Sequence, residues 1–234
     1  MKQFRETAVS PVVGVMLMLV VTIIIAAVVA AFAGGSLSNT PKTPSATIKG
    51  VFSQSGGMQI IHAGGDTIPT QDLVFELTLD PTFGTGLDAI TAQLVNRSIV
   101  MDANGKCLLN LTSGLSEVDP SFKPGDALYI NVTYIDAQYL QTQVAPCEGK
   151  AGSLNLPSEA AGASLACSGS NSHYNVYWTG TGYQYDLYSG ETSPKSFWNL
   201  AFVNPNNVGK TFTLVTLDKR TNGVISKSTV TITA

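Results

Sequence analysis

The chain has 234 residues, of which 13 are Lys or Arg and 16 are Asp or Glu, so its formal net charge is −3 at pH 7. Charged residues are only 12% of the chain and form no basic cluster, which argues against a nucleic-acid-binding protein. The low carboxylate content also argues against a surface adapted to very high salt.

An uninterrupted apolar run of 22 residues extends from Val12 to Ala33, with Thr22 as its only polar side chain. About 20 apolar residues in a helix are enough to cross the roughly 30 Å hydrocarbon core of a membrane. Lys2 and Arg5 precede the run, and positive residues near a span normally stay on the cytoplasmic side. We therefore expect a transmembrane helix with a cytoplasmic N-terminus, followed by an exported remainder.

Three interpretations of this segment differ in where the chain is cut. A cleaved secretory signal has an apolar region of about 7 to 15 residues. The run here is longer, although Ala31-Phe32-Ala33 fits the small-residue cleavage site of such signals. A permanent anchor would need no cut. In the third interpretation the cut follows Ala8, and the apolar helix stays at the N-terminus of the mature protein.

The residues around Ala8 favour the third interpretation. The string ETAVSPVVGVMLMLVVTIIIAAVVAAF resembles the N-terminus of archaeal type IV pilins, in which a short charged leader precedes a V-S-P-V-I-G-V core. Residues 9–15 match this core with one Ile-to-Val difference. The resemblance implies that a prepilin peptidase cuts between Ala8 and Val9. It gives a leader of residues 1–8 and a hydrophobic helix of residues 9–35.

The same resemblance implies a structural subunit of a surface filament. Its partners would be copies of itself, the prepilin peptidase, a pilus assembly ATPase with its membrane platform, and the membrane before assembly. The expected location is the cell surface, with the subunit inserted in the cytoplasmic membrane until it is assembled, and adhesion is the expected role. The alternative is a membrane-anchored surface protein that binds glycans and does not polymerise.

The local chemistry of the helix agrees with these expectations. Ser10 can cap a helix that starts at Pro11, where the missing N–H costs nothing. Small side chains permit close approach of neighbouring helices, and they are Gly14, Ala26, Ala27, Ala30, Ala31 and Ala33. A monomeric anchor with these alanines facing lipid remains open.

Residues 36–45 read SLSNTPKTPS and form a linker with two prolines. The sequence after it, residues 46–234, predicts strands. Residues 73–79 and 128–134 alternate apolar and polar side chains, and Asn222-Gly223 predicts a hairpin between two further strands. The predicted class is α+β, with one long N-terminal helix followed by an all-β antiparallel sandwich or barrel. An irregular insert is expected around residues 136–205.

A second motif lies in residues 58–77. His62, Gly64, Gly65 and Asp66 fit an H-x-G-G-D-x-I pattern that is similar to one in many archaeal pilin-like domains, and the resemblance implies a turn. A related phrase occupies residues 122–126. We expect His62 to hydrogen-bond the turn rather than to act as a ligand or base.

Asn96, Asn110 and Asn131 each start a glycosylation sequon, which matters only in an exported chain. On a strand over residues 128–134 Asn131 would point away from the apolar face. Asn110 likewise alternates with Leu109 and Leu111, so both are expected to face solvent.

Three cysteines leave one unpaired if a disulfide forms in the exported domain. We favour Cys147 with Cys167, which closes a shorter loop than Cys107 with Cys147, but the sequence does not fix the pairing.

No catalytic pairing, phosphate loop or zinc spacing is evident, so we expect no enzyme activity, cofactor or metal. Residues 102–105 begin like a calcium loop but are better explained as an Asn-Gly turn. An aromatic-rich segment, residues 172–188, predicts a hairpin with aromatic cross-strand pairs.

Overall fold

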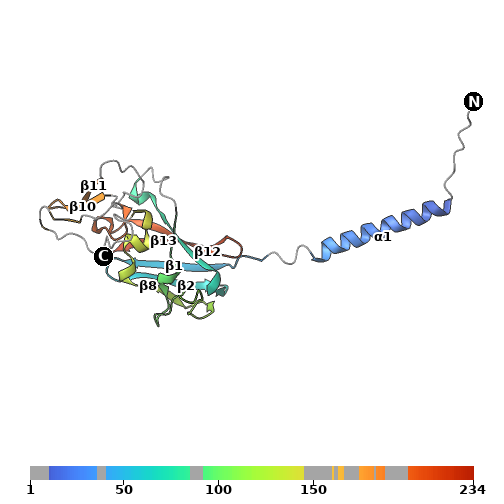
Figure 1. The fold of residues 1–234 in the computed structure, drawn as a ribbon, viewed down its shortest axis with the longest axis horizontal. Coiled ribbons are helices and arrows are strands. Elements are labelled where there is room, and N and C mark those ends of the chain that lie inside the picture. Colours follow the sequence, from blue (N-terminus) through green and yellow to red (C-terminus); the bar gives the residue numbers. More distant parts are fainter. Residues whose placement is uncertain are drawn as a thin grey trace, which may run out of the picture. The chain divides into compact units, whose positions relative to one another are not determined.

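The computed structural model describes residues 11–35, 41–84, 92–144, 160, 163–165, 174–181, 183–187 and 200–234. By its internal contacts the chain divides into two units, Met1–Lys42 and Thr43–Ala234. Helix α1 (Pro11–Gly35) belongs to the first unit, and the described strands belong to the second (Figure 1).

The second unit is built on a sheet of eight strands in the order β5-β4-β12-β13-β1-β2-β8-β6. Their bounds are β1 Ala46–Ser53, β2 Gly57–Gly65, β4 Leu73–Leu79, β5 Gln93–Leu94, β6 Val100–Met101, β8 Ala127–Ile130, β12 Thr211–Asp218 and β13 Gly223–Thr233. The prediction of one apolar helix followed by a β domain is confirmed. Within the described residues the strand order is open, with β5 and β6 at its two ends.

The sheet is mixed rather than wholly antiparallel, because β1 and β13 run parallel while the other neighbours are antiparallel. Phe52 on β1 stands opposite Ile232 on β13. Nearer the start of β1, the Ser226 hydroxyl accepts a hydrogen bond from the Ile48 N–H at 3.0 Å. At this part of the parallel pair, the backbone N–H of β1 is thus satisfied by a side chain of β13.

The predicted alternation is observed on β4, where Leu73, Phe75 and Leu77 are buried. The prediction of a strand over residues 128–134 is wrong in its length. β8 ends at Ile130 because the Asn131 side chain accepts a hydrogen bond from the Thr133 N–H and starts a 3-10 turn over Val132–Tyr134.

The predicted hairpin joins β12 to β13, and Asn222 has the positive φ of 52° that such a turn requires. Its loop covers residues 219–222 rather than two residues. The Asp218 carboxylate organises the loop, since it accepts hydrogen bonds from the Arg220 N–H at 3.1 Å and from the Thr221 hydroxyl at 3.1 Å.

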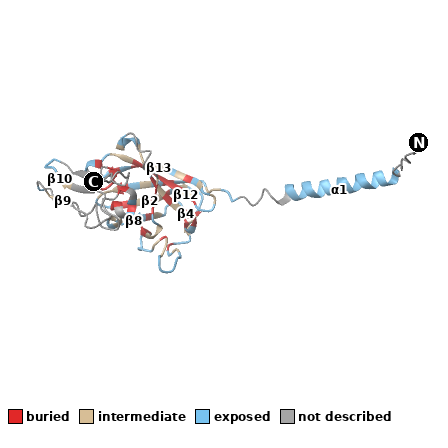
Figure 2. Cartoon of the chain, turned by 45° about the horizontal axis from the view of Figure 1, so that its top comes forward, coloured by how far each residue is buried: buried red, intermediate tan, exposed pale blue. Residues whose placement is uncertain are grey.

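The core lies within the second unit, where the buried residues concentrate in Figure 2. At its centre three aromatic rings meet. Phe212 stacks on Phe202 with centroids 4.0 Å apart, and Phe52 meets Phe212 edge-on at 5.6 Å. These rings join β1, β12 and the segment that starts at Leu200, so residues far apart in the sequence are fixed together.

Two smaller sheets complete the described fold. β3 (Ile68–Pro69) pairs with β7 (Ser121–Phe122), and β9 (Ser164–Leu165), β10 (Tyr174–Trp178) and β11 (Tyr183–Leu187) form a second group. β10 and β11 are the hairpin predicted from the aromatic segment, with Trp178 opposite Tyr183. Residues 136–205 also contribute a short helix, α2 (Ala137–Leu140), in the part of this insert that the structure describes.

Candidate functional site

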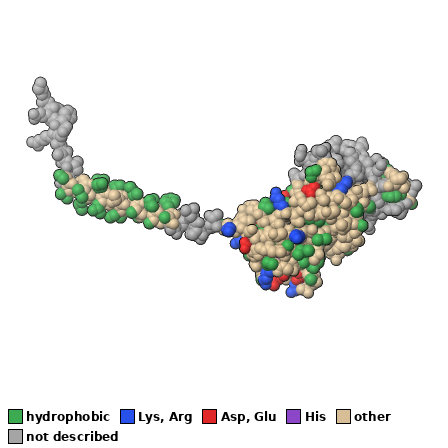
Figure 3. All heavy atoms as spheres, turned by 180° about the vertical axis from the view of Figure 1, so that it is seen from behind, with side chains coloured by type: hydrophobic (Ala, Val, Ile, Leu, Met, Phe, Trp, Pro, Cys, Tyr) green, Lys and Arg blue, Asp and Glu red, His purple; other side chains and the backbone are tan. Residues whose placement is uncertain are grey.

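Helix α1 exposes apolar side chains around its whole circumference. Its 25 residues give a length of about 37 Å at about 1.5 Å each, which exceeds a hydrocarbon core of about 30 Å. The described side chains from Pro11 to Ala33 are exposed, as Figure 2 shows by colour, and Figure 3 shows hydrophobic groups along the visible face. Its polar side chain, Thr22, donates to the Leu19 carbonyl at 2.9 Å, so its hydroxyl has a partner within the helix.

The start of the helix agrees with the role expected of Pro11, which is its first residue. The predicted cap, Ser10, and the predicted cleavage residues, Ala8 and Val9, lie outside the described residues. The described part of the helix therefore starts two residues after the expected cut.

The last linker residues are bonded to the β domain. The Ser45 N–H donates to the Asp66 carboxylate at 2.9 Å, and the Asp66 N–H donates to the Ser45 carbonyl at 2.8 Å. Two residues earlier, the hydroxyls of Thr43 and Thr221 lie 2.8 Å apart. The linker is thus held between the turn after β2 and the β12–β13 loop, and we call these contacts the linker clamp (Thr43, Ser45, Asp66 and Thr221).

The glycines of the sequence motif make the linker clamp possible. A β-bulge in β2 lets Gly64 and Gly65 pair with Thr47 and Ala46. Gly65 has a φ of +103°, and a Cβ at this position would lie 2.5 Å from the Ser45 carbonyl oxygen. Only glycine permits the linker backbone to approach so closely.

His62 is fully buried, and its Nε2 lies 2.9 Å from the Asp66 carbonyl oxygen, which it meets as a donor when that nitrogen carries the proton. The His62 ring also packs on Phe122 with centroids 5.1 Å apart. Its backbone exchanges hydrogen bonds with the phrase at residues 122–126, since its N–H donates to the Asp126 carbonyl and its carbonyl accepts from Gly125. The two sequence motifs, residues 62–66 and 122–126, therefore form one structural unit.

Replacing Gly65 by Ala is expected to lower the free energy of unfolding by about 1 to 3 kcal/mol more than replacing Gly125 by Ala. Gly125 has a similar φ of +98° but open space around its Cβ position, so it controls for the loss of glycine's backbone freedom. Urea unfolding of the full chain in detergent, followed by tryptophan fluorescence, measures both. Equal losses would show that the close approach to Ser45 is unimportant.

Comparison with known protein families is decisive for the N-terminal part. Residues 7–48 match the archaeal type IV pilin N-terminal family. This part of the chain is therefore similar to the N-terminal domain of archaeal type IV pilins. The match runs from the end of the expected leader through α1 and the linker into β1, and so includes Ser45 of the linker clamp. No curated protein matches the chain significantly.

The predicted sequons occupy three turns of the β domain. Asn96 and Asn131 are exposed, but Asn110 is half-buried, while Leu111 is 75% exposed. The alternation expected around Asn110 is therefore wrong, because residues 107–117 form a turn-rich loop rather than a strand. Within this loop the Asn110 N–H donates to the Leu115 carbonyl at 2.8 Å.

Other predicted features are placed only in part. Cys107 is half-buried with a free thiol, whereas Cys147 and Cys167 lie outside the described residues. Residues 102–105 form a turn, in which the Asp102 carboxylate accepts hydrogen bonds from the backbone N–H groups of Asn104 and Lys106. Burial raises the pKa of the Asp102 carboxyl, but the hydrogen bonds lower it by more, so this pKa lies below its ordinary value. Among the described residues, no three His, Cys, Asp or Glu side chains gather in a way that could hold a metal ion.

Proposed function

We propose that the chain is a structural subunit of a type IV pilus-like surface filament, assembled through α1 and acting in adhesion. The observation that carries this proposal is α1 itself, a long helix that is apolar on all sides and begins a pilin N-terminal domain. Such a helix is stable in lipid, but outside lipid it must bury its surface against other apolar surfaces. Like helices of neighbouring subunits supply that surface. This role is structural and requires no catalytic chemistry.

The proposed pathway begins with the subunit in the cytoplasmic membrane. A prepilin peptidase removes residues 1–8 by cutting between Ala8 and Val9, and an assembly ATPase with its membrane platform then transfers the subunit to the filament. Small side chains along α1 let helices approach closely, and they belong to Gly14, Ala26, Ala27, Ala30, Ala31 and Ala33. Each subunit meets the next through different surfaces, and such a non-closing contact produces a helical fibre.

The test combines mass spectrometry of the mature N-terminus with electron microscopy of filaments, in cells that express the matching peptidase and assembly proteins. A terminus at Val9 together with filaments containing this chain is the expected result. A terminus at Met1 without filaments would favour the anchored glycan-binding alternative. A soluble product that begins at Gly34 would remove α1 and overturn the proposal.

A further inference from the structure

The three sequons share one local conformation. In each of them the asparagine Oδ1 accepts a hydrogen bond from the N–H two residues later, at 3.0 Å for Asn96, 2.7 Å for Asn110 and 3.1 Å for Asn131. This Asx turn holds the third residue of the sequon beside the side-chain amide. The three sites differ in what the rest of that amide does.

At Asn96 and Asn131 the hydroxyl of the sequon completes the arrangement. The Ser98 hydroxyl donates to the Asn96 Oδ1 at 2.9 Å, and the Thr133 hydroxyl donates to the Asn131 Oδ1 at 3.1 Å. Two hydrogen bonds to the amide oxygen draw electron density toward it, and this makes the Nδ2 protons easier to remove. Both side chains are exposed, and no hydrogen bond to another described residue occupies either Nδ2.

At Asn110 the nitrogen of the amide is already used. Its Nδ2 donates to the Glu117 carboxylate, and its Oδ1 accepts a second N–H, that of Ser113, at 3.2 Å. The Gly114 N–H also donates to the Asn110 carbonyl at 2.7 Å. Asn110 therefore closes the 107–117 loop with both ends of its side chain, and hydrogen bonds to a charged group are the stronger ones.

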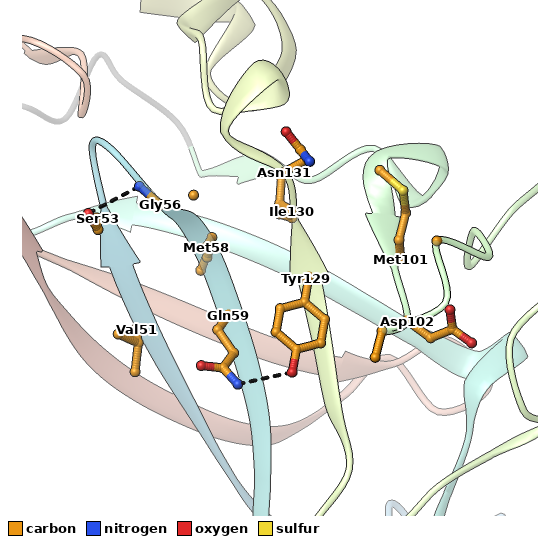
Figure 4. Close-up of a pocket in the computed structure, with 13 residues that line it drawn as sticks. Val51, Ser53, Gly56, Met58, Gln59, Met101, Asp102, Tyr129, Ile130 and Asn131 are labelled. Carbon is orange, nitrogen blue, oxygen red and sulfur yellow. Dashed lines mark hydrogen bonds between the residues drawn. The ribbon is translucent and has the colours of Figure 1, made fainter.

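The three asparagines all have room for a sugar beside them, so the difference between the sites lies in their hydrogen bonds. Asn96 and Asn110 line the same cavity of about 430 Å³, together with the edge-on ring pair of Tyr134 and Tyr139. Asn131 lies beside another cavity, of about 580 Å³, next to Tyr129 (Figure 4). A sugar would find room at each of the three, but only Asn96 and Asn131 offer a free nitrogen.

We propose that Asn96 and Asn131 are the N-glycan attachment sites of the exported domain, and that Asn110 is a structural residue that stays unmodified. The donor is a polyprenyl-phosphate-linked saccharide. The asparagine Nδ2 forms a bond to the anomeric carbon, the bond from that carbon to the phosphate oxygen breaks, and the phosphate leaves with the electron pair. Nδ2 gives up one proton to a base of the transferase. The proposal goes beyond filament assembly and requires only that the domain is exported.

The test is glycopeptide mass spectrometry on the full chain, produced in an archaeal host that attaches N-glycans to its own surface proteins. Export is checked in the same culture by protease accessibility on intact cells. We expect glycan on the peptides that contain Asn96 and Asn131 and none at Asn110. Similar occupancy at Asn110, or an exported chain without glycan at the other two sites, would overturn the proposal. A glycosylated chain that forms no filaments would leave it standing while the proposed function fails.

Variants separate the hydrogen-bond argument from folding. Glu117→Ala frees the Asn110 Nδ2 and is expected to raise occupancy at Asn110 from undetected to the level measured at Asn96. Asp119→Ala is the matched control, since it removes the same charge nearby but its carboxylate bonds Ser121 instead. Ser98→Ala is expected to abolish modification at Asn96 alone. If Asn110 remains unmodified in a folded Glu117→Ala chain, the Glu117 bond does not determine the selection.

Discussion

Replacing Ala8 by Arg is expected to abolish filaments and to leave the full-length precursor in the membrane. A peptidase that cuts between Ala8 and Val9 must accommodate the side chain before the cut, and a long charged side chain cannot occupy a site for a small one. The uncut leader keeps its charges on the cytoplasmic side, so α1 cannot leave lipid. Immunoblotting of membranes and electron microscopy of the cell surface measure precursor and filaments.

Gln3→Arg is the control for the leader variant, because it adds the same charge to the leader at a distance from the cut. It should be processed and assembled normally. Filaments of normal abundance from the Ala8→Arg chain would refute the proposed assembly pathway.

Replacing Phe212 by Ala is expected to destabilise the β domain by about 3 to 5 kcal/mol. The Phe212 side chain is fully buried and contacts the rings of Phe52 and Phe202, so its removal leaves a cavity among residues from three separate segments. Urea unfolding followed by tryptophan fluorescence is suited to the measurement, because Trp178 packs against the core.

Leu94→Ala provides the comparison, since Leu94 is 68% exposed on a strand at the end of the sheet. It should change the free energy of unfolding by no more than about 0.5 kcal/mol. A loss at Phe212 as small as that at Leu94 would mean that the three rings do not form the centre of the core.

Features with a local cause were predictable from the sequence. The apolar run that forms α1 and the alternation of β4 each depend on neighbouring residues, so periodicity finds them. The end of β8 was missed because a side chain, that of Asn131, competes with the strand for the Thr133 N–H. Asn110 was misjudged for a similar reason, since its side chain bonds Glu117 across a loop and does not lie on a strand.

The linker clamp shows what a single sequence conceals. The motif at residues 62–66 predicted a turn, but nothing in it indicates that Asp66 would bind Ser45 of the linker. The bonds between His62 and the phrase at residues 122–126 are likewise invisible, because they join segments about sixty residues apart through backbone atoms. The periodicity of the sequence cannot predict such contacts, because they form only when the sheet folds.

The position of β1 between two other strands has a mechanical consequence for a subunit in a filament. Tension that reaches the domain through the linker acts first on the contact between the Thr43 and Thr221 hydroxyls, then on the reciprocal Ser45 and Asp66 bonds, and then on β1. That strand lies inside the sheet, with β13 on one side and β2 on the other, so it has no free edge from which to peel. Many hydrogen bonds must yield together before it is extracted, and resistance to force is governed by the rate of that event rather than by equilibrium stability. A surface fibre under flow would gain endurance from the position of its first strand.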